Sequence, residues 1–161
     1  LRAAGATGKV VNIKKGQWMT PEDMHDAVEK AREAGAPSVA VTERGTFFGY
    51  GDLIVDMRSF QRIRTACGVP VIFDGTHSLQ RLGHASGSRG GDREFIPTLV
   101  RASVAAGCDG LFLEVHPDPA SAPSDGTTML PLDQLKPLLE RVIAIRTVLA
   151  EVDLETSVSA G

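Results

Sequence analysis

The chain has 161 residues, of which 42% are hydrophobic and 23% are charged, as is usual for one globular domain. Its net charge is −3, its Lys and Arg residues are scattered, and its aromatic content is low, which together argue against nucleic acid as a partner. No apolar run approaches the ~20 residues that span a bilayer and the start is not a signal peptide, so we predict a soluble, cytoplasmic protein without a membrane partner.

Short apolar, β-prone runs alternate with helical patterns along the chain. Residues 1–8 look like the end of a helix, which glycines terminate. The predicted strands are residues 10–15, 38–44, 70–77 and a run that starts at residue 110. The predicted helices are residues 21–35, 53–67, 93–106 and 133–152, with a frayed tail from Leu154. Residues 45–51 and 83–92 are rich in glycine and are predicted to be loops, the second of a length common in lids.

Four βα alternations predict an α/β fold with a parallel sheet. Periodicity alone does not separate a doubly wound sheet from a (β/α)8 barrel. The strand ends favour the barrel, because all of them bring polar groups to one rim. These groups are Lys14 and Lys15, Glu43 and Arg44, Asp74 and His77, and Glu114 and His116.

The polar residues at the strand ends suggest two kinds of chemistry. Lys14 offers a compact ammonium charge and Arg44 a planar guanidinium group, which together suit a small ligand that carries a carboxylate and a phosphate. The ordinary alternative is that both are solvated surface cations. His77 and Glu114 at the strand ends, with Asp125 in the loop after the fourth strand, offer one nitrogen and two hard oxygens, which suit Zn, Mn or Fe, but such dispersed residues are a weak signal by themselves. A single His at a strand end is more often a hydrogen-bonded structural residue, so spacing alone leaves the metal site open.

Two isolated cysteines carry little functional signal. Cys67 ends a helical pattern and Cys108 precedes the fourth strand, positions typical of small buried hydrophobes. Their spacing fits neither a metal site nor a disulfide framework. We therefore predict two free thiols in a reducing compartment.

Several motifs resemble the 3-deoxy-D-manno-octulosonate 8-phosphate synthase family, also named 2-dehydro-3-deoxyphosphooctonate aldolase. They are Val-Asn-Ile-Lys-Lys-Gly-Gln at 11–17, Thr-Glu-Arg-Gly-Thr-Phe-Phe-Gly-Tyr at 42–50, Val-Ile-Phe-Asp-Gly-Thr-His-Ser-Leu-Gln at 71–80, Leu-Phe-Leu-Glu-Val-His-Pro-Asp-Pro at 111–119 and Ser-Asp-Gly at 124–126. They occur in order over almost the whole chain.

The resemblance implies that residues 1–161 form a single (β/α)4 portion, strands five to eight, of a TIM-type (β/α)8 barrel, with the N-terminal half absent. Because a half-barrel leaves two unpaired strand edges, we expect this portion to be inactive by itself.

The family condenses phosphoenolpyruvate with arabinose 5-phosphate and water, which gives the octulosonate phosphate and inorganic phosphate for lipopolysaccharide synthesis. By resemblance, Lys14 and Arg44 belong to the phosphoenolpyruvate pocket, and the matched motifs add Asn12, Gln17 and Phe48 as substrate contacts. The metal ligands are expected to be His77, Glu114 and Asp125, with His77 and Asp125 also catalytic. His116 is expected to be structural or to support a ligand, and His84 to lie in a loop that closes over substrate. Family members are usually tetramers.

The metal-dependent class is the expected one. In that class a Cys on the first strand of the barrel is the fourth ligand, whereas metal-independent members carry Asn there and tend to have Cys before the loop aspartate. Here Ser124 precedes Asp125.

Two other functions stay open. One is the sister reaction of 3-deoxy-arabino-heptulosonate 7-phosphate synthase, which uses erythrose 4-phosphate. The other is an inactive half-barrel that serves as an assembly scaffold.

Overall fold

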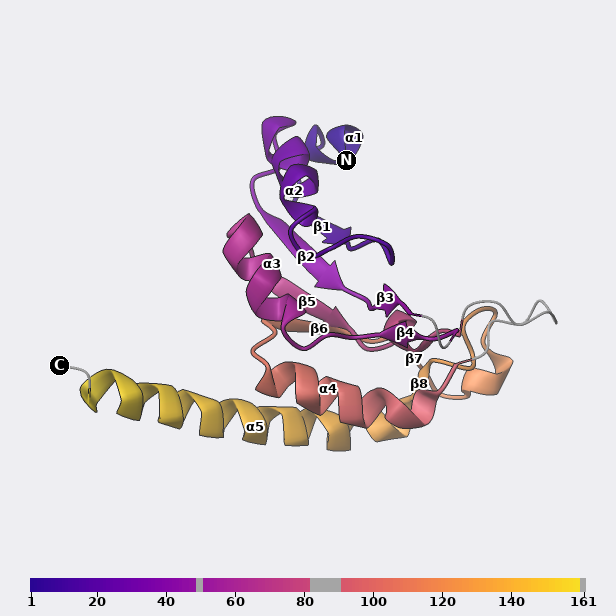
Figure 1. The fold of residues 1–161 in the computed structure, drawn as a ribbon. Helices are drawn as coiled ribbons and strands as arrows, with labels where there is room; N and C mark the ends of the chain where they lie inside the picture. Colours follow the sequence, from indigo (N-terminus) through magenta and orange to yellow (C-terminus); the bar gives the residue numbers. More distant parts are fainter. Residues whose placement is uncertain (49–50, 82–90, 160–161) are drawn as a thin grey trace.

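The computed structural model describes residues 1–48, 51–81 and 91–159, with side chains up to residue 152. Its centre is a four-stranded sheet in the order β1-β2-β5-β6, in which every neighbouring pair is parallel (Figure 1). The strands are β1 (Val11–Lys14), β2 (Val39–Glu43), β5 (Val71–Asp74) and β6 (Gly110–Phe112). The predicted parallel α/β fold is confirmed. The strand order follows the chain, so all four carboxyl ends lie at one edge.

The helices cover one side of this sheet (Figure 1). They are α2 (Met24–Glu33), α3 (Ser59–Cys67), α4 (Ile96–Ala105) and α5 (Leu132–Ser159), with the short α1 (Arg2–Gly5) against α2. Side chains of β1 alternate, so Val11 and Ile13 are buried in the core, whereas Asn12 and Lys14 face the opposite, open side. This alternation separates a packing face from a face that is available for chemistry.

The region between β2 and α3 differs from the prediction. Leu53 and Ile54 form strand β4 (Leu53–Ile54), which pairs antiparallel with β3 (Thr46–Phe47), and α3 begins only at Ser59. The helix predicted from residue 53 was therefore too long, and the predicted loop at 45–51 contains a strand. The hairpin forms because Leu53 is buried opposite Phe47, whose ring stacks on Trp18 at a centroid distance of 4.3 Å.

The last third of the chain also departs from the predicted boundaries. The fourth predicted strand is divided into β6 and β7 (Val115–His116), and β7 pairs with β8 (Leu130–Pro131). Three short 3₁₀ turns, η1 (His77–Leu79), η2 (Arg93–Phe95) and η3 (Pro119–Ser121), connect the larger elements. Helix α5 continues to Ser159, so the expected fraying from Leu154 was wrong. Residues 82–90, which include most of the predicted glycine-rich loop and His84, lie outside the described residues.

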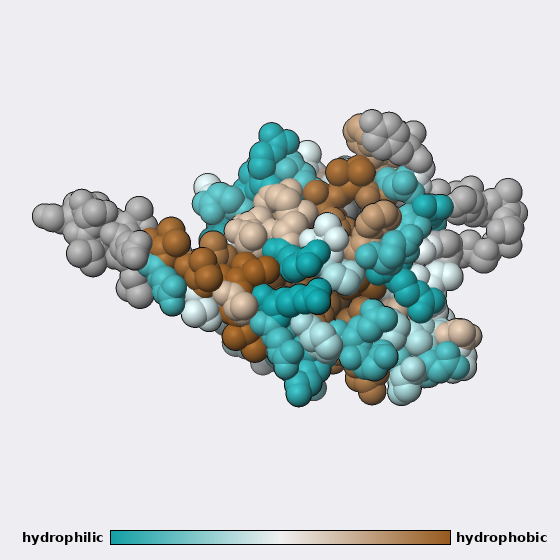
Figure 2. Space-filling model, turned by 90° about the horizontal axis from the view of Figure 1, so that it is seen from below, coloured by the Kyte–Doolittle hydropathy of each residue, from teal (hydrophilic) through white to brown (hydrophobic). Residues whose placement is uncertain are grey.

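Helix α5 exposes apolar side chains along much of its length. Leu132, Leu139, Ile143, Val148 and Val152 are each between 39% and 64% exposed. Figure 2, which views the molecule from the α4 and α5 side, shows hydrophobic residues that continue along the outer part of α5. Nowhere in the described ranges does a helix combine the length and apolar character needed to cross a membrane.

Both cysteines are free and buried, as predicted. Burial is the main reason that the pKa of the Cys67 thiol is raised, and it raises the pKa of Cys108 to about 11.

We therefore predict that neither thiol reacts with iodoacetamide in the native protein near neutral pH. The raised pKa values keep both thiols protonated, and burial keeps the reagent away from the sulfur atoms. Mass-spectrometric mapping of alkylated peptides should find Cys67 and Cys108 modified only after denaturation. Rapid alkylation of both in the native protein would contradict this packing.

Candidate functional site

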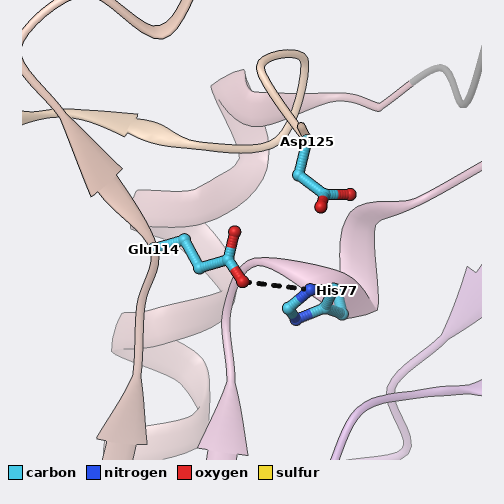
Figure 3. A group of neighbouring side chains, drawn as sticks. All are labelled: His77, Glu114 and Asp125. Atoms are coloured by element: carbon cyan, nitrogen blue, oxygen red, sulfur yellow. Dashed lines mark ion pairs between the residues drawn. The ribbon is translucent and has the colours of Figure 1, made fainter. Parts of the chain in front are cut away.

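Three side chains converge at the carboxyl edge of the sheet. His77 begins η1 directly after β5, Glu114 lies between β6 and β7, and Asp125 lies in the turn before β8. Their potential ligand atoms all lie within 4.8 Å of one another, and His77 Nε2 is 3.3 Å from Glu114 Oε1. Figure 3 shows the three side chains pointing toward a common space from separate segments.

The donor set suits a divalent metal ion. It offers one imidazole nitrogen and two carboxylates, all half-buried, in a compact group that water still reaches. An imidazole with two hard oxygens is compatible with Zn, Mn and Fe, so the donors do not distinguish these ions.

Asp125 is held in position by its surroundings. It is the one non-glycine residue with a positive φ, 53°, among the described residues. Its Oδ1 accepts a hydrogen bond of 2.8 Å from Gln80 Nε2, and its carbonyl accepts one of 2.9 Å from the Thr128 amide. A Cβ atom on the following Gly126 would collide with the Pro119 carbonyl, so only glycine fits there. A left-handed residue held by such contacts is typical of a functional turn.

Glu114 is oriented by its backbone. Its amide donates a hydrogen bond of 2.8 Å to Thr76 Oγ1, and its carbonyl accepts one of 3.0 Å from the Leu130 amide. The turn after β5 and the start of β8 therefore determine where this carboxylate lies.

Asp74 is a further functional candidate. Its position at a strand end was predicted from the sequence, but no function was predicted for it. It is the last residue of β5 and is fully buried. Burial alone would raise its pKa, but hydrogen bonds from the His77 ring, from backbone amides and from Lys14 outweigh burial and lower the pKa to about 2. Asp74 is thus a buried carboxylate anion. The signal for it was its position three residues before His77, at the end of an apolar strand.

Lys14 crosses the open face of the sheet to reach Asp74. Its strand, β1, is separated from β5 by β2, yet Lys14 Nζ is 2.8 Å from Asp74 Oδ2. The ammonium also lies 3.9 Å from the centroid of the Phe112 ring. Lys14 is therefore paired with a buried carboxylate, although 38% of its side chain stays exposed.

The remaining predicted substrate contacts lie on β1 or in the segments that follow β1, β2 and β3. Arg44 follows β2 directly, is half-buried, and makes no hydrogen bond or ion pair within the described part of the chain. Asn12 faces the open side and accepts a hydrogen bond of 2.7 Å from Thr42 Oγ1. Gln17 follows β1 and is half-buried, whereas Phe48 is 48% exposed beyond β3.

Lys15 has a different role from its neighbour. It lies on the packing face, fully buried, and its Nζ is 3.5 Å from the buried Glu43 Oε1. The same ammonium donates to Thr46 Oγ1 at 3.0 Å and to the carbonyl of Gly45 at 3.3 Å. Lys15 therefore joins the segment after β1 to the segment after β2, which carries Arg44.

Replacing Lys15 by Met should lower the free energy of unfolding by about 3–5 kcal/mol, because Glu43 would remain as a buried charge without its partner. Glu43 Oε1 would keep only the hydrogen bond of 2.7 Å from the Gly45 amide, and Oε2 has no hydrogen bond, so the charge would lose its only cationic partner among the described residues. Lys14→Met is the matched control and should cost far less, because its side chain is partly solvated. Denaturant titration measures both, and equal losses would contradict the assignment.

His116 contacts the prolyl turn that follows β7. Its Nδ1 lies 2.7 Å from the Asp118 carbonyl oxygen and 3.1 Å from the Asp118 amide nitrogen. A protonated Nδ1 donates to the carbonyl, whereas an unprotonated Nδ1 accepts from the amide. Either contact supports the turn.

Comparison with known proteins identifies the family. The profile of the DAHP synthetase I family matches residues 1–151. A protein of Desulfosudis oleivorans named 2-dehydro-3-deoxyphosphooctonate aldolase is 51% identical over 151 residues, which cover 94% of this chain and 54% of the relative. Proteins with the same name from Bradyrhizobium diazoefficiens and Brucella ovis are 54% and 53% identical over 144 residues, 89% of this chain and 51% and 52% of their own lengths.

The chain belongs to the DAHP synthetase I family. The resemblance to proteins named 2-dehydro-3-deoxyphosphooctonate aldolase is confirmed by these relatives, and the chain spans about half their length. The parallel strands with helices on one side fit the TIM-barrel type of fold.

Proposed function

We propose that the protein that carries this chain condenses phosphoenolpyruvate with arabinose 5-phosphate and water, and that it releases 3-deoxy-D-manno-octulosonate 8-phosphate and phosphate. The observation that carries the proposal is the convergence of His77, Glu114 and Asp125 next to Lys14 at one edge of the sheet. Relatives with about half of their residues identical to this chain bear the name of the corresponding aldolase.

The side chains of the site have different roles in this proposal, according to their chemistry. We assign Arg44 and Lys14 to the carboxylate and phosphate of phosphoenolpyruvate, because Lys14 ends β1 and Arg44 directly follows the adjacent β2. Asn12, Gln17 and Phe48 complete the substrate rim in this proposal. His77 and Asp125 would contact the reacting groups, and Asp125 is also placed to accept hydrogen bonds from sugar hydroxyls.

The metal centre is part of the proposal. His77, Glu114 and Asp125 would hold Zn, Mn or Fe, with a fourth ligand from a segment outside this chain. A bound divalent ion would orient or polarise the sugar aldehyde, or lower the pKa of a water molecule. The protein's own part is to present the three ligands from a rigid sheet edge, with Gln80 holding Asp125.

We predict that His77→Ala in the full-length protein removes bound metal and lowers phosphate release by at least about 10²-fold, because a ligand and a reacting-group contact are lost together. Metal content and phosphate release with both substrates are the measurements. His25→Gln, on the exposed side of α2, is the control and should behave like the wild type. Turnover that survives His77→Ala would exclude the assigned role.

The two alternatives can be separated in the same assay. The sister reaction predicts faster phosphate release with erythrose 4-phosphate than with arabinose 5-phosphate, whereas the relatives' names favour arabinose 5-phosphate. An inactive scaffold predicts no release with either aldose, no bound metal and no affinity for phosphoenolpyruvate.

We also propose that residues 1–161 are one (β/α)4 half of a (β/α)8 barrel. The outer strands β1 and β6 support this, because within the described residues each pairs with one neighbour only in this sheet, and closure into a barrel would give each a second neighbour. The exposed residues Leu139 and Ile143 of α5 support it as well, since they offer an apolar surface to a further helix. A tetrameric state and a cytoplasmic location complete the proposal, the latter supported by the free thiols.

Backbone amides of β1 test the half-barrel proposal. The Val11 and Lys15 amides donate to β2, so the alternating Asn12 and Lys14 amides point to the free edge. If another strand pairs there, both should exchange at least about 10³-fold more slowly than in an unstructured peptide, which corresponds to ~4 kcal/mol of opening free energy. Hydrogen exchange of the full-length protein measures this, with Val11 as the internal reference. Rapid exchange of Asn12 and Lys14 alone would rule out closure at β1.

A further inference from the structure

The buried carboxylate of Asp74 makes contacts to both halves of the proposed site. Its Oδ1 accepts hydrogen bonds from the backbone amides of Thr76 at 3.0 Å and His77 at 2.8 Å. Its Oδ2 lies 2.8 Å from His77 Nδ1 and 2.8 Å from Lys14 Nζ. One side chain therefore holds the backbone of the turn, the imidazole ring and the ammonium group together.

The contact with the ring determines which nitrogen carries the proton. Asp74 Oδ1 accepts two backbone hydrogen bonds and Oδ2 accepts one from the Lys14 ammonium, so both oxygens act as acceptors and the contact with the ring places a proton on His77 Nδ1. In neutral imidazole the lone pair then lies on Nε2. Nε2 is the nitrogen that faces Glu114, at 3.3 Å from Oε1. The lone pair is thus directed at the space that the three candidate ligands share.

Lys14 is restrained by the same oxygen. Its Nζ is 3.4 Å from His77 Nδ1, and because both atoms carry protons the shared Asp74 oxygen is what holds them close. The Phe112 ring lies beside both groups, with its centroid 3.9 Å from Lys14 Nζ and 5.8 Å from the His77 ring centroid. A shift of Asp74 would therefore move the imidazole and the ammonium together.

We propose that Asp74 is a positioning residue, which selects the Nδ1-protonated tautomer of His77 for metal binding and at the same time anchors Lys14 for the anionic substrate. This rests on the proposed function, because it takes His77 as a metal ligand and Lys14 as a substrate contact. Carboxylates that accept a hydrogen bond from a ligating histidine commonly strengthen metal affinity by 10- to 100-fold.

Asp74→Asn in the full-length protein tests the proposal. The asparagine oxygen can keep the two backbone hydrogen bonds, which leaves its NH₂ group facing His77 Nδ1. An NH₂ donor favours the Nε2-protonated tautomer, which has no lone pair toward the metal. We expect about 10- to 100-fold weaker binding of Zn²⁺ in chelator competition, and Nε2 protonation in ¹⁵N spectra of the apoprotein.

Asp109→Asn is the matched control. Asp109 Oδ2 likewise accepts a backbone hydrogen bond, from Val71 at 2.8 Å, and pairs with a cation, Arg64, but it precedes β6 at the opposite edge of the sheet. This variant should bind Zn²⁺ within about twofold of the wild type, because it leaves the contacts of His77 unchanged.

Three results separate the possible failures. The inference is overturned if neutral His77 of the wild-type apoprotein carries its single proton on Nε2, a measurement that needs no variant to fold. It is also overturned if Asp74→Asn keeps both the Nδ1 proton and wild-type Zn²⁺ affinity. If the wild type binds no Zn²⁺ although His77 is protonated at Nδ1, the proposed metal function fails while the positioning of the ring by Asp74 stands.

Discussion

The hydrogen bonds to the buried Asp74 carboxylate are the constraint on which the site depends. A carboxylate removed from water must be satisfied by the protein, and here four donors meet that need. Because the donors come from β1 and from the turn after β5, which includes the His77 ring, satisfying one charge fixes these two segments relative to the end of β5. Lys14 and His77 are neighbours because they share this acceptor.

A second buried charge shows how the two faces of the sheet divide support from function. Lys15 and Glu43 form an ion pair on the packing face, where neither side chain is reached by solvent. Their neighbours in sequence are Lys14, which faces the open side of β1, and Arg44, which directly follows β2 and is half-buried. The internal pair holds the segments after β1 and β2 together, and each of its members is next in sequence to a cation of the proposed substrate site.

Much of the fold could be predicted because the signals were local. The four parallel strands follow from apolar runs that alternate with helical periods, and the buried cysteines follow from their positions in those runs. The β3–β4 hairpin could not be predicted in this way. Leu53 and Ile54 fit a helical period equally well, and the pairing of Phe47 with Leu53, beside the stacked Trp18, is a tertiary contact.

For the site, the sequence by itself determined which chemical groups stand at the strand ends, because a parallel sheet brings those ends to one edge. It thereby placed His77 and Glu114 at one edge, the family resemblance added Asp125 as the third ligand, and the structure brings their ligand atoms together. Only the tertiary structure decided that Lys14 is paired, that Lys15 is internal, and that Asp74 links the cation to the imidazole. The physical reason is that hydrogen-bond partners and burial depend on distances across strands. The contact of Lys14 with Asp74 across β2 joins residues far apart in the sequence, so no periodic pattern predicts it.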